Sequence, residues 1–255
     1  MKKTILLSSL FAVGAAFAAA TEVDSGNAVG ALDLSVSNNV QQQTLISVPF
    51  VGYETDDAVK VKVKDMVKTS NLANGSKLYV ADGNGGYHTW KLFNGAWVAD
   101  NKVTIGAGGQ PVEGAAADQD DFTVNRGDSF WLEPVFAESA TSGTIYLLGQ
   151  KGDGEGSSRA AVKWNLLGNA SVDPVTLSNA EDSGFANGEQ VVVQVNGKLR
   201  YWTYKTSKGG WYYVKNEGTR STGEPLTIAA GQGFWFRSTA SKTINWSTGK
   251  AAAAQ

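Results

Sequence analysis

Carboxylates are the side chains whose number and spacing in this sequence could support catalysis. Two of them placed on either side of a sugar can hydrolyse a glycosidic bond as general acid and base or nucleophile. The candidates are Asp118, Asp120, Asp121, Glu133, Asp153, Glu155, Glu181 and Asp182. Nearly all lie in Gly-rich or polar stretches, where a solvated surface carboxylate is the ordinary interpretation. We therefore expect no catalytic residues, and a glycoside hydrolase is the less favoured alternative.

Nucleophilic and metal-dependent catalysis have little basis in the remaining residue types. His88 is the single histidine, the chain has no cysteine, and no serine lies in a Gly-x-Ser-x-Gly turn. A histidine-rich or thiolate metal site therefore cannot be assembled. Oxygen ligands for calcium cluster at Asp118–Asp121 and Asp82–Asn84, but an EF-hand starting at Asp82 would need Glu where Phe93 stands. We predict a protein that is not an enzyme and has no metal site, with calcium as the remaining cofactor candidate.

Aromatic side chains crowd two matching hairpins and are the most informative residues. The candidates for ligand contact are Trp90, Trp97, Trp202, Tyr204 and Trp211. Flat apolar rings with polar rims can stack on sugars or hold a partner chain. The same residue types also fill cross-strand pairs inside twisted sheets. The sequence leaves both alternatives open, and the burial of these rings distinguishes them.

The chain is organised around a strand that occurs twice. Gly127–Trp131 and Gly231–Trp235 both have the pattern Gly-x-x-Phe-Trp, and such internal similarity is typical of a tandem repeat. Neighbouring side chains of a strand point to opposite faces. We therefore expect the Phe side of each strand in a core, and Trp131 and Trp235 on a second, partly exposed surface or at the seam between repeats.

Composition and turn signals predict the fold class. The chain has 30 Gly and only 5 Pro, and apolar residues alternate with polar ones between Gly- and Asn-rich turns, which is typical of short antiparallel strands. We predict an all-β protein made of two tandem related β-sandwich-like or barrel-like units with Gly-rich turns. Thr44–Phe50, an almost continuous apolar run, is expected to be a central strand of the first unit.

Domain boundaries follow from the repeat and from loop composition. We predict a first β unit over residues 30–149 and a second over residues 160–250, joined by a linker over 150–159 that contains no apolar residue. Indels between the two units fall in loops, where a shared scaffold tolerates them.

The alignment of the two units also assigns individual positions. It places Trp202 at the position of His88 and Tyr204 at the position of Trp90. A histidine that is replaced by tryptophan in the second copy suits a position filled for packing. We therefore expect His88 to have a structural role.

The first 18 residues have the features of a signal peptide. Lys2 and Lys3 precede the apolar run Thr4–Phe17, and Ala16–Ala18 forms a small-x-small cleavage site. We expect export to the periplasm, the outer-membrane surface or the extracellular space, with no transmembrane segment in the mature chain. The net charge of −2 and the charged fraction of 18% provide no basic stripe, so nucleic acid is not an expected partner.

Three short motifs carry a resemblance to a known group of proteins. Leu45–Phe50 (LISVPF), Trp164–Asn169 (WNLLGN) and Gly231–Trp235 (GQGFW) are similar to a β-rich module of uncharacterised exported repeat proteins from Verrucomicrobia and related bacteria. The first copy departs from the module because Gln-Thr-Leu stands where Trp-Asn is usual. The resemblance implies a bacterial surface protein and carries over no catalytic residue.

The sequence therefore predicts a non-enzymatic exported protein of the cell surface or periplasm, with a structural or adhesive role. The alternative is a carbohydrate-binding module that uses the hairpin aromatics. The partner would be a glycan or another surface protein.

Overall fold

The protein is nearly all β, which confirms the predicted fold class. A computed structural model describes residues 29–37, 43–51, 60–82, 86–100, 103–105, 111–113, 122–136, 142–150, 156–195, 198–214, 220–221 and 225–254. Strands account for most of these residues, beside one short helix, α1 (Val63–Met66), and one 3-10 turn, η1 (Thr206–Lys208). Within the described ranges, no helix is both long and apolar enough to cross a membrane.

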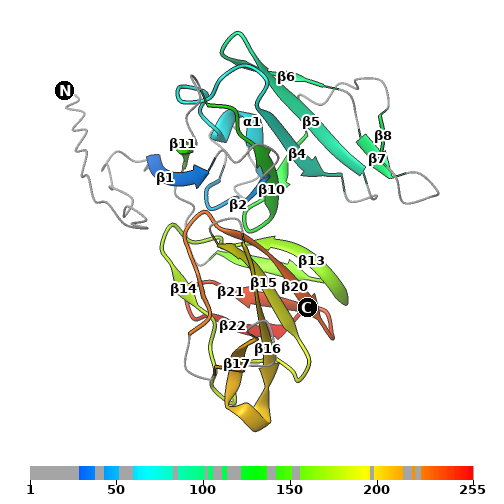
Figure 1. Cartoon of the computed structure of the whole chain (residues 1–255). Coiled ribbons are helices and arrows are strands. Elements are labelled where there is room, and N and C mark those ends of the chain that lie inside the picture. The colour runs from blue at the N-terminus through cyan, green and yellow to red at the C-terminus, as the bar shows by residue number, and fades with distance from the viewer. Residues whose placement is uncertain are drawn as a thin grey trace, which may run out of the picture.

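The strands lie in two bodies, one above the other in Figure 1. The first body contains β1 (Val29–Ser37), β2 (Thr44–Ser47), β3 (Lys60–Val61), β4 (Lys77–Ala81), β5 (Gly86–Phe93), β6 (Ala96–Ala99), β7 (Val103–Ile105), β8 (Pro111–Glu113), β9 (Val124–Asn125), β10 (Ser129–Glu133) and β11 (Ser142–Gln150). The second contains β12 (Ser157–Ala160), β13 (Lys163–Gly168), β14 (Val175–Thr176), β15 (Gln190–Val195), β16 (Lys198–Lys205), β17 (Gly210–Val214), β18 (Arg220–Ser221), β19 (Thr227–Ile228), β20 (Gly233–Ser238), β21 (Lys242–Asn245) and β22 (Lys250–Ala253).

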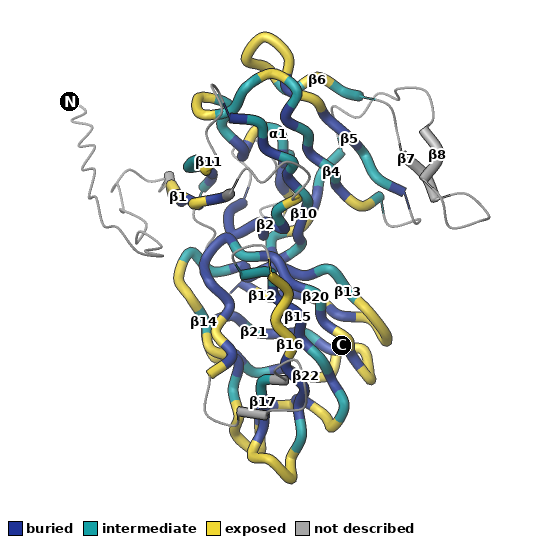
Figure 2. The backbone as a smooth tube through the Cα atoms, viewed as in Figure 1, coloured by how far each residue is buried: buried dark blue, intermediate teal, exposed yellow. Residues whose placement is uncertain are grey.

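Each body is a two-layer sandwich. The main sheet of the first body has the order β2-β10-β4-β5-β7-β8 with β6 also paired to β5, and the main sheet of the second has the order β13-β20-β15-β16-β17-β18. The β1–β11 pair forms the other layer of the first body, and the β12-β21-β22 sheet that of the second. Phe130 packs with Leu34 in one core, and Phe236 with Ile244 in the other. Figure 2 shows that buried residues lie along the strands and exposed ones mainly at turns.

The two main sheets share their pairing register. Trp131 of β10 lies opposite Leu45 of β2 and Tyr79 of β4. Trp235 of β20 lies opposite Leu166 of β13 and Val192 of β15, in the same two positions. A shift of one residue would move every side chain to the other face, so agreement on both sides of the strand makes the two sheets equivalent position by position. The duplication of an ancestral unit remains a prediction, which this register supports.

The register corrects the alignment of the hairpin aromatics. Trp90 lies opposite Leu78 on β4, and Trp202 lies opposite Val191 on β15, so Trp202 corresponds to Trp90 rather than to His88. The sequence alignment was therefore displaced by two residues along this strand. The assignment of these side chains to one face of the sheet is unchanged, because a shift of two residues keeps a strand side chain on the same face.

A repeated turn sets this register in both bodies. The motif Ala-Asn-Gly occurs at residues 73–75 and 186–188, directly before β4 and β15, and the glycine of each motif has a positive φ. The asparagine of the first motif accepts a hydrogen bond from the backbone N–H of Asn94 at 2.8 Å. The asparagine of the second accepts one from Thr206 at 2.8 Å. Each motif therefore holds the open end of its hairpin, where the second strand ends, in the same way.

The bodies are joined by a reciprocal seam, defined by residues 46–47 and 127–128 of the first body and 167–168 and 231–232 of the second. The N–H of Ser47 donates to the carbonyl of Gly231 at 2.9 Å, and the N–H of Gly168 donates to the carbonyl of Gly127 at 2.8 Å. The register makes Ser47 equivalent to Gly168 and Gly127 equivalent to Gly231. The seam thus has the self-complementary form of a two-fold interface within one chain.

Two boundaries differ from the prediction. β12 begins at Ser157 and pairs with β21, so residues 157–159 of the predicted linker belong to the second sandwich, which continues beyond residue 250 to the end of β22. β2 ends at Ser47 and lies at the end of its sheet rather than at the centre. Its continuous apolar sequence reflects the seam, which covers its outer edge through the bridge between Ile46 and Gln232. The predicted signal peptide, residues 1–18, lies outside the described residues.

Candidate functional site

The five aromatic residues selected from the sequence lie mainly in the cores. Trp90, Trp202, Tyr204 and Trp211 are 1%, 6%, 2% and 2% exposed. Trp97 is half-buried and donates its indole N–H to the carbonyl of Val67 at 2.9 Å. Four of the rings therefore cannot stack on a surface ligand, and the ligand-binding assignment is corrected to the alternative that placed these residues in a core.

The packing of Tyr204 explains its burial. Its ring centroid lies 5.8 Å from that of Phe185 and 5.3 Å from that of Trp211, with tilted or edge-on geometry. Its hydroxyl lies 2.8 Å from the hydroxyl of Ser183. A buried tyrosine usually needs such a partner for its polar end, so this residue ties the core to the loop that precedes β15.

Two of the three candidate carboxylates that the structure describes, Glu133 and Asp182, have contacts with neighbouring side chains. Glu133 accepts a hydrogen bond from the Tyr79 hydroxyl at 2.9 Å. Asp182 is exposed and pairs with Lys250 at 2.7 Å, and the hydrogen bond and charge of that lysine lower the pKa of Asp182. Glu181 is exposed in the same loop. The other five candidates, Asp118, Asp120, Asp121, Asp153 and Glu155, lie outside the described residues.

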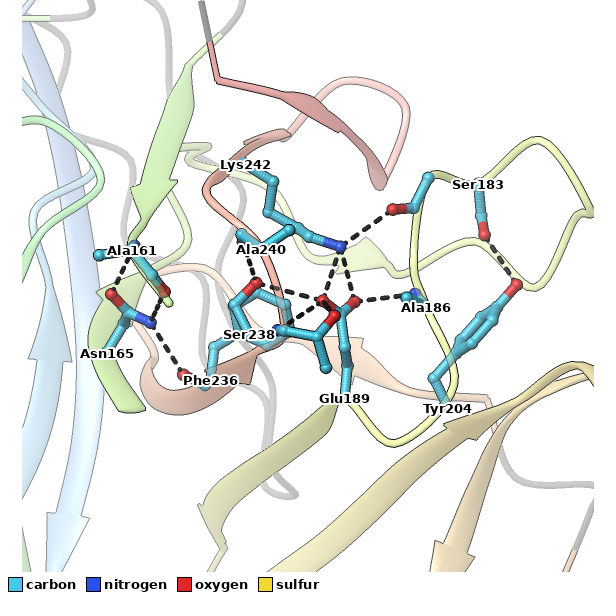
Figure 3. Close-up of polar contacts among 12 residues, drawn as sticks. Ala161, Asn165, Ser183, Ala186, Glu189, Tyr204, Phe236, Ser238, Ala240 and Lys242 are labelled. Carbon is cyan, nitrogen blue, oxygen red and sulfur yellow. Dashed lines mark hydrogen bonds and ion pairs between the residues drawn. The ribbon is translucent and has the colours of Figure 1, made fainter. Parts of the chain in front are cut away.

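Glu189 is a buried carboxylate that the sequence did not single out. It is 0% exposed and forms an ion pair with Lys242, with Oε1 and Nζ 2.6 Å apart. Figure 3 shows that further donors surround the carboxylate, including the Ser238 hydroxyl at 3.1 Å and the N–H of Ala186 at 3.0 Å. The N–H of Thr239 also donates to Oε1 at 3.1 Å. With its oxygens satisfied by protein groups, Glu189 anchors the ends of β15, β20 and β21 rather than offering a reactive group.

In the first body, a smaller residue holds the end of the corresponding strand. Ser76 occupies the position equivalent to Glu189, and its hydroxyl oxygen accepts a hydrogen bond from the N–H of Val135 at 2.8 Å. Val135 is the equivalent of Thr239. In both bodies, the residue at this position therefore holds the end of the strand that contains the Phe-Trp pair, which is β10 in the first body and β20 in the second.

The metal and histidine expectations stand as follows. Within the described ranges, no group of three or more His, Asp or Glu side chains is placed to hold a metal ion. The calcium candidate Asp118–Asp121 lies outside these ranges, as do Asn84 and its neighbour Gly83, which follow Asp82. The ring of His88 lies 3.8 Å from the ring of Phe122, and its structural role stays a prediction.

Two exposed aromatic residues, Trp164 and Tyr201, lie on the outer face of the second sheet, whereas Phe93 is exposed on the first. Side chains alternate across a strand, so the residues that flank the core-facing Phe234, Phe236 and Val191 point to the opposite side. We call this set the aromatic face; it consists of Trp164, Leu166, Gln190, Val192, Leu199, Tyr201, Trp235 and Arg237. Trp164, Leu199 and Tyr201 are 52%, 47% and 44% exposed, and Figure 2 shows the exposed outer end of β13. Half-buried Trp235 and buried Val192 lie on the strands between Trp164 and Tyr201, and an apolar face of this kind is a candidate contact surface.

The aromatic face continues to the first body through one ring contact. The centroids of Trp131 and Trp235 lie 5.2 Å apart, and both residues are half-buried. The close approach of the two sheets beside this pair needs small residues, because a Cβ on Gly233 would lie 2.5 Å from Cγ of Leu45. The outer faces of the two sheets therefore meet at the seam.

The sequence contained a signal for this face but did not identify it. Strand β16 carries aromatic residues at successive positions, with Tyr201 on one side and Trp202 and Tyr204 on the other. Alternation alone indicates that the strand has two faces. It does not indicate which of them the second layer of the sandwich covers. The choice needed the position of β21 and β22, which pack on the Trp202 side.

Comparisons with protein-family models, curated proteins and solved structures found no match to this chain.

Proposed function

We propose that this protein is a non-enzymatic exported binding protein of the bacterial cell surface or periplasm, with an adhesive role, and that the aromatic face makes the contact. The observation that carries the proposal is the exposure of Trp164 and Tyr201 on an outer sheet face while the aromatic residues of the opposite face are buried. Burying large apolar side chains is favourable by about 25 cal/mol per Å², so their exposure is costly unless a partner covers them. Tryptophan, tyrosine and arginine are also the residues that most often dominate binding energy at interfaces.

Three carboxylates in the described part of the chain support a binding role over a catalytic one. Glu133, Asp182 and Glu189 each contact a neighbouring protein group. The burial of Glu189 with Lys242 is typical of a structural anchor, since a reacting carboxylate must reach a substrate. The features of a signal peptide in residues 1–18 support the exported location.

The test is retention of the purified mature protein on intact bacterial cells. We expect the wild type to sediment with the cells and the double variant Trp164→Ala and Tyr201→Ala to lose at least tenfold in retention. Phe93→Ala is the matched control, because Phe93 is 58% exposed but lies on the first sheet; it should be retained like the wild type. Equal retention of all three proteins would contradict the assignment of the aromatic face, and no retention of the wild type would contradict the adhesive role.

Export has a separate test. The full chain, produced in a bacterium with a Sec system, should appear in the periplasmic or extracellular fraction. N-terminal sequencing should find that the chain starts close after Ala18. Recovery of the uncleaved chain from the cytoplasm would contradict export.

A further inference from the structure

Two aromatic rings on the aromatic face are spaced along a line that crosses the strands. Trp235 lies opposite Val192 on the neighbouring strand, and Val192 lies opposite Tyr201 on the next. Because neighbouring strands are about 4.8 Å apart, the two aromatic positions are separated by about 10 Å. Val192, only 5% exposed, forms a low apolar floor between them. The spacing is about that of one disaccharide unit, so alternate sugar rings of an extended chain could stack on the two aromatic side chains.

Hydrogen-bonding side chains form a second line beside the first. Arg237 lies opposite Trp164 on one side and opposite Gln190 on the other. Within the described part of the chain, neither the Arg237 guanidinium nor the Gln190 amide forms a hydrogen bond or ion pair with another residue. A guanidinium presents donors in a fork that matches a carboxylate or a sulfate. These groups are therefore placed to bond a ligand that lies on the adjacent rings.

The charge of this face differs from that of the whole protein. The chain has a net charge of −2, yet the charged residues that the register places on the described outer face of the second sheet are the cations Arg237 and Lys205. The described carboxylates of the second body lie elsewhere, in the loops at Asp173, Glu181 and Asp182 or buried at Glu189. The face thus complements a negatively charged partner.

We propose that the aromatic face binds an acidic polysaccharide that runs across the strands. Sugar rings stack on Trp235 and Tyr201, and the carboxylate or sulfate of the polymer pairs with Arg237. The inference rests on the proposed adhesive function and names its ligand class. A protein partner would use the same residue types, but the separation of two flat rings by about 10 Å beside a line of hydrogen-bonding groups favours a polymer of sugar rings.

The test compares acidic polymers with their neutral counterparts by isothermal titration calorimetry on the mature protein. The probes are polygalacturonate with its carboxyl-reduced form, and dextran sulfate with dextran. The first pair reports recognition of a carboxylate and the second recognition of a sulfate. We expect the wild type to bind one acidic polymer at least tenfold more tightly than its neutral counterpart, and the affinity should fall as salt is added.

Variants locate the binding. Arg237→Gln should remove most of the preference for the acidic polymer, whereas Tyr201→Ala should weaken binding to both members of the pair at least tenfold. Lys91→Gln, which removes an exposed cation of the first sheet, should leave the affinities unchanged. Arg237 and Tyr201 are exposed, so both variants are expected to fold, and unchanged near-UV circular dichroism checks this.

The outcomes separate this inference from the function on which it rests. Equal binding to acidic and neutral polymers would overturn the acidic specificity and leave glycan adhesion standing. No binding to any of the four polymers, while cell retention still depends on Trp164 and Tyr201, would overturn the polysaccharide assignment in favour of a protein partner. Loss of preference in Lys91→Gln as well as in Arg237→Gln would show unspecific charge attraction and would also overturn the proposal.

Discussion

The indole rings of Trp131 and Trp235 lie 5.2 Å apart at an interplanar angle of 56°. One ring belongs to β10 and the other to the equivalent strand β20, and hydrogen bonds at the seam connect the sheets of these two strands. The pair is therefore a direct packing contact between the two bodies, and it connects the outer faces of both sheets.

The first prediction concerns the energy of this pair. Trp131→Ala and Trp235→Ala should each destabilise the protein, and the double variant should lose less than the sum by about 0.5–1.5 kcal/mol, the usual coupling of an aromatic pair. Urea unfolding of the four proteins measures it. Combining Trp235→Ala with Trp97→Ala is the control, since Trp97 lies on the far hairpin β6; these two should be additive. Additive losses for the Trp131–Trp235 pair as well would show that the bodies do not couple through it.

The second prediction concerns the glycine that begins the Gly-x-x-Phe-Trp motif. Gly127 has φ +90°, and an added Cβ would lie 2.4 Å from the carbonyl oxygen of Ser157. Gly127→Ala should therefore cost about 3 kcal/mol or more, because left-handed strain adds to a collision with the backbone of the other body. Gly95→Ala is the matched control, since Gly95 has φ +78° and nothing within 4 Å; it should cost only about 1–2 kcal/mol. Thermal unfolding measures the loss of stability in each variant. Equal losses would show that the collision with the Ser157 carbonyl does not contribute.

Much of the architecture followed from the sequence because it depends on local signals. The Gly-x-x-Phe-Trp motif predicted that Phe130 and Phe234 are buried and that the tryptophans lie on the other side, and the structure confirms both. The Ala-Asn-Gly turns and the alternation of β4 and β15 are similarly local, because turn chemistry and side-chain period act over a few residues.

The location of the aromatic face did not follow from the sequence because it depends on which side of a sheet is covered. The sequence selected Trp90, Trp202, Tyr204 and Trp211 for their aromatic rings, and these face the second layer of each sandwich. Tyr201 and Trp164 are exposed although they have the same residue types. The second layer comes from strands far along the chain, such as β21, so no local pattern at β16 could identify the open face.

The third prediction is a pH dependence that originates at the seam. Burial raises the pKa of Asp128 above its ordinary value of 3.8, although Asp128 accepts a hydrogen bond from the N–H of Asn125. A carboxyl with a raised pKa in the folded state binds more protons when folded than when unfolded, so its contribution to stability is greatest at low pH. That contribution falls as the pH rises from 3.8 through the folded-state pKa.

Asp128→Asn tests this dependence. The amide oxygen can still accept from Asn125, as the amide of the equivalent Gln232 does from Ala229 at 2.9 Å, while the cost of burying a charge disappears. The variant should be more stable than the wild type at neutral pH, and the difference should shrink as the pH approaches 3.8. Asp182→Asn is the control with the opposite sign, because Lys250 lowers the pKa of Asp182; its effect should be small, since the pair is exposed. Urea midpoints measured over this pH range test the expectation. An Asp128→Asn variant less stable than the wild type at neutral pH would contradict the argument.

The last prediction concerns the buried ion pair of the second body. Lys242→Met leaves the Glu189 carboxylate, which is 0% exposed, without its cation, although the donors from Ala186 and Thr239 remain. Leaving a buried charge unpaired usually costs about 3–5 kcal/mol, and the loss should appear as a lower urea midpoint. Lys250→Met also removes a lysine from an ion pair, but its partner Asp182 is exposed, so the urea midpoint should change little. A double variant Glu189→Gln and Lys242→Met should recover part of the loss, because the neutral amide can still accept from Thr239. If Lys242→Met and Lys250→Met had similar small effects, Glu189 would not be the anchor that joins β15, β20 and β21.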